Sequence, residues 1–175
     1  MTDTIDRDSL IRVVGEFART LAGRYEISDV LYQLVEDVVT LLRVAGAGVS
    51  LRDEENKLRP VTGINSLTTR IEATEEALQE GPCVDAFRHG GAVVVADLDD
   101  ERNRWPHWSS YALNAGIHAV LGIPLAVRGE PIGAMNVYAA ERRDWTPTEI
   151  ETARLLADMA ASYVANASDL EKLQR

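Results

Sequence analysis

Two β-rich stretches joined by a short turn constrain the fold of this chain more than any other feature. Residues 118–127 and 131–138 are dominated by aliphatic side chains, and Arg128, Gly129 and Glu130 connect them. Apolar runs separated by a few residues that include glycine are typical of a β-hairpin. Because the strands of a hairpin run in opposite directions, we expect an antiparallel sheet.

The rest of the chain alternates between extended and helical patterns. A second hairpin is expected over residues 47–52 and 58–62, and a further short strand over 92–95. Helices are expected over residues 8–21, 29–44 with Ser28 as N-cap, 67–79, 82–88, 108–114 and 146–173. This order describes an α+β domain with the sheet between layers of helices. At 175 residues the chain is expected to form a single domain, residues 1–175.

Alternation along residues 118–127 separates two faces of the expected sheet. Leu121, Ile123 and Leu125 share one face and are expected to be core residues. The opposite face carries smaller residues such as Gly122 and Pro124. That face leaves room either for closely packed helices or for a ligand.

The last helix has the clearest start, because Thr146 and Glu149 form a capping box around Pro147. Within this helix the side chains then repeat at alternating spacings of three and four, which is typical of a coiled coil. The repeating residues are Leu156, Met159, Tyr163, Asn166, Leu170 and Leu173.

Two interpretations of this repeat remain open: a helix that lies on its own sheet, and a helix that pairs with a second copy of the chain. We favour a parallel homodimer in which Asn166 fixes the register. An apolar stripe on the first helix is expected to join the interface, through Leu10, Val14, Phe17 and Leu21.

The composition and charge exclude several classes of protein. The formal net charge of −10 opposes contact with polyanions, so direct binding of nucleic acid by these residues is not expected. The chain has neither a signal-peptide pattern nor an apolar run long enough to span a membrane, which predicts a cytoplasmic protein without membrane contact. The single cysteine, Cys83, excludes an internal disulfide and a cysteine-rich metal site.

Short motifs occur in a characteristic order along most of the chain. They are GPCVDAF (81–87), VVVADL (93–98), Trp105-Pro106, Gly116, GIPL (122–125), GAMN (133–136) and Leu156-Ala157-Asp158. In this order and spacing they resemble GAF domains. More narrowly, they resemble the sensory GAF domains that precede an RNA-binding ANTAR domain in actinobacterial transcription antitermination regulators. The resemblance covers residues 10–167.

The resemblance implies a fold and a function. The expected fold is a central antiparallel sheet of five or six strands, with the N- and C-terminal helices on one face and short helices and loops over a pocket on the other. The expected function is that of a sensory domain, often dimeric, which binds a small molecule and transmits its occupancy through the terminal helices. In ANTAR-containing relatives the output domain would follow helix 146–173, which would serve as a coiled-coil linker. No ANTAR domain is present here, so we expect either an isolated sensory half or a GAF domain that acts through a partner.

The candidate residues for the implied pocket come from the cysteine motif, the aromatic loop and the central hairpin. They are Cys83, Phe87, Trp105, Trp108, Tyr111, His118, Val120, Asn136 and Tyr138. The three loop aromatics are candidates for a lid over the ligand, with simple pinning of the loop to the body as the alternative. Asn136 either orients a ligand or bonds to a neighbouring loop.

Cys83 lies in the first turn of the expected helix 82–88, where the helix dipole favours a thiolate. Glu80 and Asp85 place negative charge on both sides of the thiol, which raises its expected pKa, and Phe87 shares its face of the helix. We therefore favour a buried structural cysteine over a redox sensor.

No catalytic residues and no metal site are predicted. One GAF-like family reduces methionine sulfoxide, but that chemistry needs a second thiol, which a chain with one cysteine lacks. The signature of the cyclic-nucleotide-binding members is missing as well, so the ligand stays unidentified. Two alternatives to a small-molecule sensor remain open: a redox or haem sensor that uses Cys83 or His118, and a module that only dimerises.

Overall fold

Five antiparallel strands form one sheet in the order β2-β1-β5-β4-β3. The computed structural model describes the backbone of residues 5–174 and the side chains of residues 5–167. The strands are β1 (Gly46–Arg52), β2 (Leu58–Gly63), β3 (Val93–Val95), β4 (Ala119–Val127) and β5 (Glu130–Ala139). The helices are α1 (Arg7–Leu21), α2 (Ile27–Leu42), α3 (Ser66–Leu78), α4 (Pro82–His89), α5 (Pro106–Asn114) and α6 (Pro147–Gln174), with a 3₁₀ turn η1 (Leu98–Glu101). The expected α+β class is confirmed.

The central hairpin is β4–β5, and its turn explains its sequence. Arg128 and Gly129 both have positive φ, 53° and 79°. A two-residue turn of this kind matches the right-handed twist of the two strands. The resulting register places Gly122 opposite Asn136 and Val120 opposite Tyr138.

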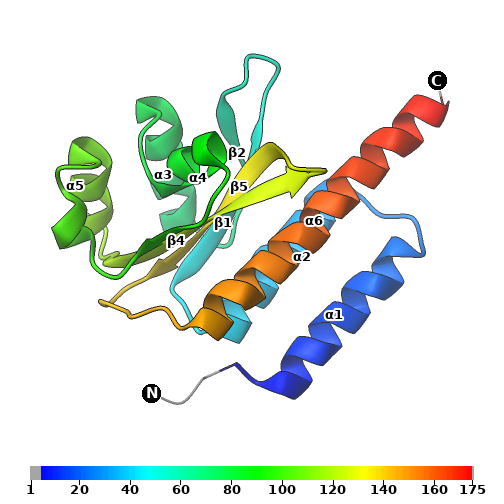
Figure 1. The fold of residues 1–175 in the computed structure, drawn as a ribbon, viewed down its shortest axis with the longest axis horizontal. Coiled ribbons are helices and arrows are strands. Elements are labelled where there is room, and N and C mark those ends of the chain that lie inside the picture. The colour runs from blue at the N-terminus through cyan, green and yellow to red at the C-terminus, as the bar shows by residue number, and fades with distance from the viewer. Residues whose placement is uncertain (1–4, 175) are drawn as a thin grey trace.

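The helices form two layers on opposite faces of the sheet (Figure 1). Helices α2 and α6 cover one face, and α1 packs outside them. Helices α3, α4 and α5 lie on the other face. The expected GAF-like arrangement is therefore confirmed. Among the described helices, none has the length and apolar character needed to cross a membrane.

The two faces of β4 differ as the alternation predicts. Leu121, Ile123 and Leu125 are buried in the larger core, between the sheet and α2 with α6. On the other face Gly122 lies against Pro82 of α4. The smaller residues of this face therefore admit closely packed helices.

The start of α6 is held by several contacts. Thr146 and Glu149 form the expected capping box, with each backbone N–H bonded to the other side chain at 2.9 and 3.1 Å. Arg143 donates to the carbonyl of Leu42 at 2.7 Å and pairs with Glu149. Trp145 Nε1 donates to the carbonyl of Val95 at 3.1 Å. These contacts attach the first turn of α6 to α2 and β3.

The start of α2 differs from the expectation. Ser28 lies inside the helix, and the N-cap is Glu26, whose side chain makes no capping bond. The helix is positioned instead by its apolar residues, since Leu31, Leu34 and Val35 are fully buried.

Three residues expected at the dimer interface are buried within the single chain. Leu156 is fully buried in the core under α6, and the Tyr163 ring packs on Phe17 and Tyr25 with centroids 5.7 and 5.2 Å apart. We therefore correct the interface prediction for Phe17, Leu156 and Tyr163, because these side chains already cover this chain's own core. Leu156 of α6 thus covers its own core, and Tyr163 packs against α1 and the segment that follows α1.

The other interface candidates occupy several environments. Leu10, Val14 and Met159 are half-buried, whereas Leu21 and Asn166 are exposed. Leu170 and Leu173 lie outside the residues whose side chains are described. The homodimer itself stays a prediction.

Candidate functional site

Four polar side chains meet between the sheet and the helices of its second face. Asn136 and Tyr138 come from β5, and Glu72 and Glu75 come from α3. Each of the four is at most 2% exposed. Burial of polar groups in a protein interior is costly unless they are hydrogen-bonded.

The amide of Asn136 is the centre of this buried cluster. Its Nδ2 donates to Glu75 Oε1 at 2.6 Å, to the Tyr138 hydroxyl at 2.9 Å and to Glu72 Oε2 at 3.4 Å. Glu72 Oε1 and Asn136 Oδ1 have no hydrogen-bond partner among the described residues. The network is therefore only partly satisfied.

Glu75 also fixes the start of α4. Its Oε2 accepts hydrogen bonds from the backbone N–H groups of Cys83 at 2.8 Å and Val84 at 3.2 Å. Gly81, the N-cap residue, contributes no side-chain capping bond. A side chain of α3 thus replaces the missing cap of α4 and ties the two helices together.

Small residues allow these helices to approach the sheet closely. A Cβ atom added to Gly48 of β1 would collide with the Glu72 carboxylate. At Gly122 of β4, an added Cβ would lie 2.7 Å from the carbonyl oxygen of Pro82, at the start of α4. Glycine at both positions is therefore a condition for the cluster.

Burial changes the protonation of the cluster. Desolvation raises the pKa of Glu72 to about 8, although hydrogen bonds from Tyr138 and Asn136 oppose the rise. Burial, and then the neighbouring Glu72, raise the pKa of Glu75 well above its usual value. Burial raises the pKa of the Cys83 thiol strongly too, and the two glutamates add to that rise. Two buried carboxyl groups this close cannot both be ionised at neutral pH without a compensating positive charge.

Little empty space remains beside the cluster. The cavity bordered by Glu72, Glu75 and Cys83 measures about 10 Å³. That volume is close to the minimum for a single water molecule. In this arrangement the site accommodates an atom-sized guest and not a metabolite.

The tryptophans form part of the core behind the cluster. Trp105 and Trp108 are 2% and 0% exposed, and their rings pack edge to face with centroids 5.9 Å apart. Trp108 also lies 6.5 Å from the ring of Tyr138. In this arrangement the two residues attach the loop to the body, and a role as a lid stays a prediction.

Comparison with protein families supports the fold. Residues 25–165 match the sequence profile of the GAF domain. The chain belongs to the GAF domain family. Solved GAF domains of phosphoenolpyruvate-protein phosphotransferases share the fold. The domain from Coxiella burnetii has a TM-score of 0.74 at 15% identity, covering 94% of this chain and 98% of that one. The domain from Acinetobacter has a TM-score of 0.71 at 17% identity, covering 93% of each chain.

Similar full-length proteins include transcription regulators. The anaerobic nitric oxide reductase transcription regulator NorR of Serratia proteamaculans is 27% identical over 98% of this chain. NorR of Aeromonas hydrophila is 26% identical over the same share. The chain spans 33% of the length of each of these relatives. This GAF domain is therefore similar to one part of a longer regulator.

The GAF fold brings part of the expected pocket together. Cys83, Asn136 and Tyr138 meet in the buried cluster. Phe87 and Val120 lie in the smaller apolar core on the same face of the sheet. Asn136 bonds to buried carboxyl groups, which neither of its two sequence-based interpretations anticipated.

Two other candidates lie outside the cluster. Tyr111 is 37% exposed on α5. The side chain of His118 is 38% exposed, and its Nδ1 lies 3.6 Å from Asp97 Oδ1. Both side chains are therefore partly open to solvent, and the lid role of Tyr111 and the haem role of His118 stay predictions.

Glu72 and Glu75 are the site residues that the sequence analysis missed. They share a helical face with Thr68 and Ile71, because the spacings from residue 68 are three, four and seven. All four side chains are buried. Two acidic residues on a face that also carries isoleucine were the signal that could have identified a buried polar site.

Two groups of side chains in the described part of the chain could hold a metal ion, each with ligand atoms within 4.8 Å of one another. They are Glu72 with Glu75 and Cys83, and Asp97 with Asp99 and His118. The second group is partly exposed and has a structural explanation, because Asp97 caps η1 by accepting from the Asp99 N–H at 3.0 Å. In the buried group Glu75 likewise caps a helix, α4, whereas Glu72 Oε1 has no hydrogen-bond partner among the described residues.

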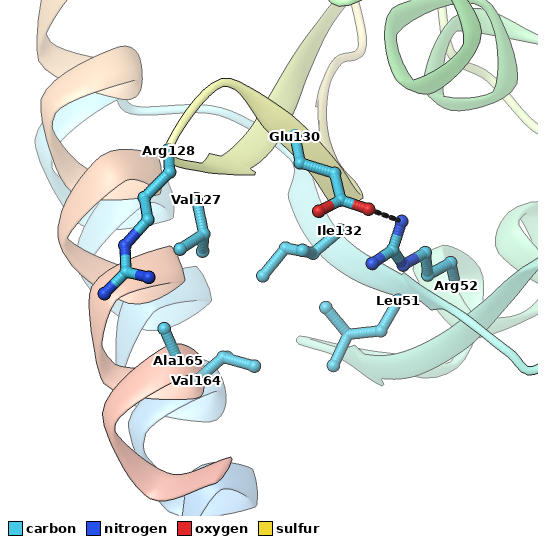
Figure 2. Close-up of a pocket in the computed structure, with 8 residues that line it drawn as sticks. All are labelled: Leu51, Arg52, Val127, Arg128, Glu130, Ile132, Val164 and Ala165. Carbon is cyan, nitrogen blue, oxygen red and sulfur yellow. Dashed lines mark hydrogen bonds and ion pairs between the residues drawn. The ribbon is translucent and has the colours of Figure 1, made fainter. Parts of the chain in front are cut away.

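A separate groove lies between the tip of the β4–β5 hairpin, the end of β1 and α6 (Figure 2). Its volume is about 440 Å³, and Leu51, Val127 and Val164 form part of its apolar wall. An ion pair of 2.9 Å between Arg52 and Glu130 borders it. The expected pocket residues lie elsewhere in the GAF domain.

Proposed function

We propose that this GAF domain is a regulatory, non-catalytic sensor that converts a change at the buried cluster into a change at the terminal helices. The alternation of side chains along β5 carries this proposal. Asn136 and Tyr138 belong to the cluster, whereas Met135 and Val137 lie in the core shared with α2 and α6. A shift of β5 therefore alters the packing on both faces of the sheet at once.

The proposed ligand is a small molecule that binds after α3 and α4 move away from the sheet. With about 10 Å³ beside the cluster, the structure corresponds to the closed arrangement. A ligand that fits only the open arrangement shifts the population toward it by its difference in affinity for the two. The tie between Glu75 and α4 moves α3 and α4 as one unit.

The proposed output is control of transcription by a further domain or a partner. The similarity to transcription regulators supports this role, and the motif resemblance supports an RNA-binding ANTAR domain and antitermination as its specific form. In either case the output domain contacts the nucleic acid, because this chain carries a net charge of −10. The proposed setting is a homodimer in the cytoplasm.

Native mass spectrometry followed by hydrogen exchange tests the sensor role. The mass of freshly purified protein reports both subunit number and any retained small molecule, and a thermal-shift screen of metabolites extends the search. With a molecule that raises the melting temperature, we expect altered exchange in α3 and α4, which move, and in residues 156–167 of α6.

Two results would contradict the proposal. Binding that changes exchange in α3 and α4 but leaves α6 unchanged would show that occupancy is not transmitted. A native mass without any retained molecule, together with a screen without hits, would favour a module that only dimerises.

A further inference from the structure

The buried cluster of Glu72, Glu75, Cys83 and Asn136 concentrates acidic groups without a basic partner. Both glutamates are 2% exposed, and no lysine or arginine forms an ion pair with either of them within residues 5–167. Carboxyl groups buried in this way must either hold protons or contact a cation.

Two unpartnered atoms point to a missing partner. Glu72 Oε1 and Asn136 Oδ1 are buried and lack hydrogen bonds. Asn136 is fully buried, and its amide already contacts both carboxyl groups through Nδ2. Turning this amide about its last bond would exchange Nδ2 for Oδ1 and present an oxygen to the cluster.

The donor atoms and the available volume determine which kind of ion or molecule could bind here. The carboxylate oxygens of Glu72 and Glu75 and the sulfur of Cys83 all lie within 4.8 Å of one another. The cavity that they border measures about 10 Å³, which excludes an organic cation and admits a single ion. A thiolate favours transition metals over Mg²⁺ and Ca²⁺, which prefer oxygen ligands.

We propose that Glu72, Glu75 and Cys83 form a binding site for one divalent first-row transition-metal ion, with the amide oxygen of Asn136 as an additional donor. Carboxyl and thiol groups bind a metal ion in their deprotonated forms, so protons compete with the ion and affinity rises with pH. The bound ion, with a charge of +2, is then held by three anionic ligands. The inference is independent of the sensor role, because the ion would bind whether or not the domain transmits a signal.

The ion would also join the elements around it. Its ligands come from α3 and α4, and Asn136 adds β5. The backbone N–H groups of Cys83 and Val84 already orient the Glu75 carboxylate. Such outer hydrogen bonds are typical of metal sites, because they fix the direction of a ligand. Metal binding should therefore stabilise the closed arrangement.

Cobalt(II) is a suitable probe, because a thiolate–cobalt bond produces a charge-transfer absorption in the near ultraviolet. The chain has one cysteine, so such a band assigns the ligand to Cys83. The chain is unfolded and refolded anaerobically with a reductant and Co²⁺, which removes slow entry into the core as an obstacle. We expect one Co²⁺ per chain, the charge-transfer band, and a higher melting temperature than without metal.

Variants distinguish Co²⁺ binding at this site from binding at other acidic groups. Cys83→Ser should abolish the band, and Glu72→Gln should weaken Co²⁺ binding by at least about tenfold. Asp99→Asn, in the partly exposed acidic group, should change neither result. Circular dichroism shows whether each variant is folded, and elemental analysis of wild-type protein purified without chelators gives a readout that needs no variant.

The proposal would be overturned if refolded wild-type protein showed no charge-transfer band at millimolar Co²⁺. It would also be overturned if Co²⁺ bound without that band, or if Asp99→Asn removed the bound ion. None of these results bears on whether a small molecule alters α6, so failure here is distinguishable from failure of the sensor role.

Discussion

Glu72 and Glu75 occupy positions of α3 that would suit apolar side chains. Both are buried on the helical face that carries Ile71, and they share the Nδ2 of Asn136. Their protonation state therefore controls the charge of the interior. In the absence of a bound cation, the folded state holds protons that the unfolded chain would release at neutral pH.

This proton retention predicts that stability decreases as pH rises. The pKa of Glu72 is about 8 in the folded state and about 4.5 in the unfolded chain. Its contribution is therefore fully present below the unfolded value and is lost as pH rises toward 8. The slope is about 1.4 kcal/mol per pH unit for one such carboxyl group. Urea unfolding of metal-free protein between about pH 5.5 and 7.5 should show this decrease, and Glu72→Gln should reduce it.

Glu76→Gln controls for the loss of one acidic side chain from the same helix, since Glu76 pairs with Arg59 outside the cluster. If Glu72→Gln and wild-type protein had equal slopes, the proton would not reside on this side chain.

Part of the cluster is predictable from the sequence. Burial of Cys83 follows from its apolar neighbours and from the general behaviour of free cysteine. The neighbours that raise the pKa of its thiol were assigned wrongly, however. They are Glu75 and Glu72, which lie eight and more residues away in sequence, and not Glu80 and Asp85. In the structure Glu80 caps α5 and Asp85 pairs with Arg104. Proximity along the chain was a poor guide, because Glu75 of α3 reaches the start of α4 in the folded chain.

Among the elements, α4 depends on both the sheet and α3. Pro82 lies against Gly122 of β4, and Glu75 supplies its N-terminal hydrogen bonds. A short helix of eight residues has little stability of its own. Its position therefore depends on these two contacts and on its buried side chains, which include Val84 and Phe87.

Gly122→Ala should displace α4 and destabilise the domain. The new Cβ would lie 2.7 Å from a backbone oxygen, which cannot move without the helix. Overpacking of this kind typically costs about 1–3 kcal/mol. Thermal and urea unfolding measure the change, and hydrogen exchange should show faster exchange in α4.

Gly91→Ala is the matched control, because nothing lies within 4 Å of an added Cβ there. Its effect should stay within about 0.5 kcal/mol. Equal stability of the two variants would contradict the close packing of α4 on β4.

The sequence predicted elements correctly where a residue acts directly on the adjacent backbone. The capping box of α6 and the turn of the central hairpin, with its positive φ angles, are examples. Ser28 failed as the start of α2, since the burial of Leu31 and Leu34 decides where that helix lies. Tertiary packing overrides a capping preference worth about 1 kcal/mol.

In the molecule as a whole, α6 has one side against the protein core and one side toward solvent, so that adjacent residues differ in burial. Leu156 is fully buried, whereas Leu155 is 42% exposed. A spacing of three and four residues marks an apolar stripe but does not identify what covers it. The sequence therefore predicted that α6 has a buried side, and the fold shows that this side covers the chain's own sheet.

Substitutions at this pair of residues show which of the two contributes to the stability of the single chain. Leu156→Ala should lower the free energy of unfolding by about 2–5 kcal/mol, because it leaves a cavity in the core. Leu155→Ala should change that free energy by no more than about 0.5 kcal/mol. Urea unfolding measures both effects.

We expect the proposed homodimer to use the exposed side of the terminal helices. Leu155→Glu should therefore yield monomers with an unchanged circular dichroism spectrum, as measured by light scattering after size-exclusion chromatography. A variant that remained dimeric would place the interface away from this side of α6.

Contacts with α2 and β3 hold the first turn of α6 in place. A tilt of this helix would therefore rotate it about a pivot near Pro147. Its 28 residues extend over about 42 Å at a rise of 1.5 Å per residue. A tilt of about 5° at the pivot would swing the far end by about 4 Å over that length. A small rearrangement of the sheet that tilts α6 would thus displace the far end of the helix by several ångströms.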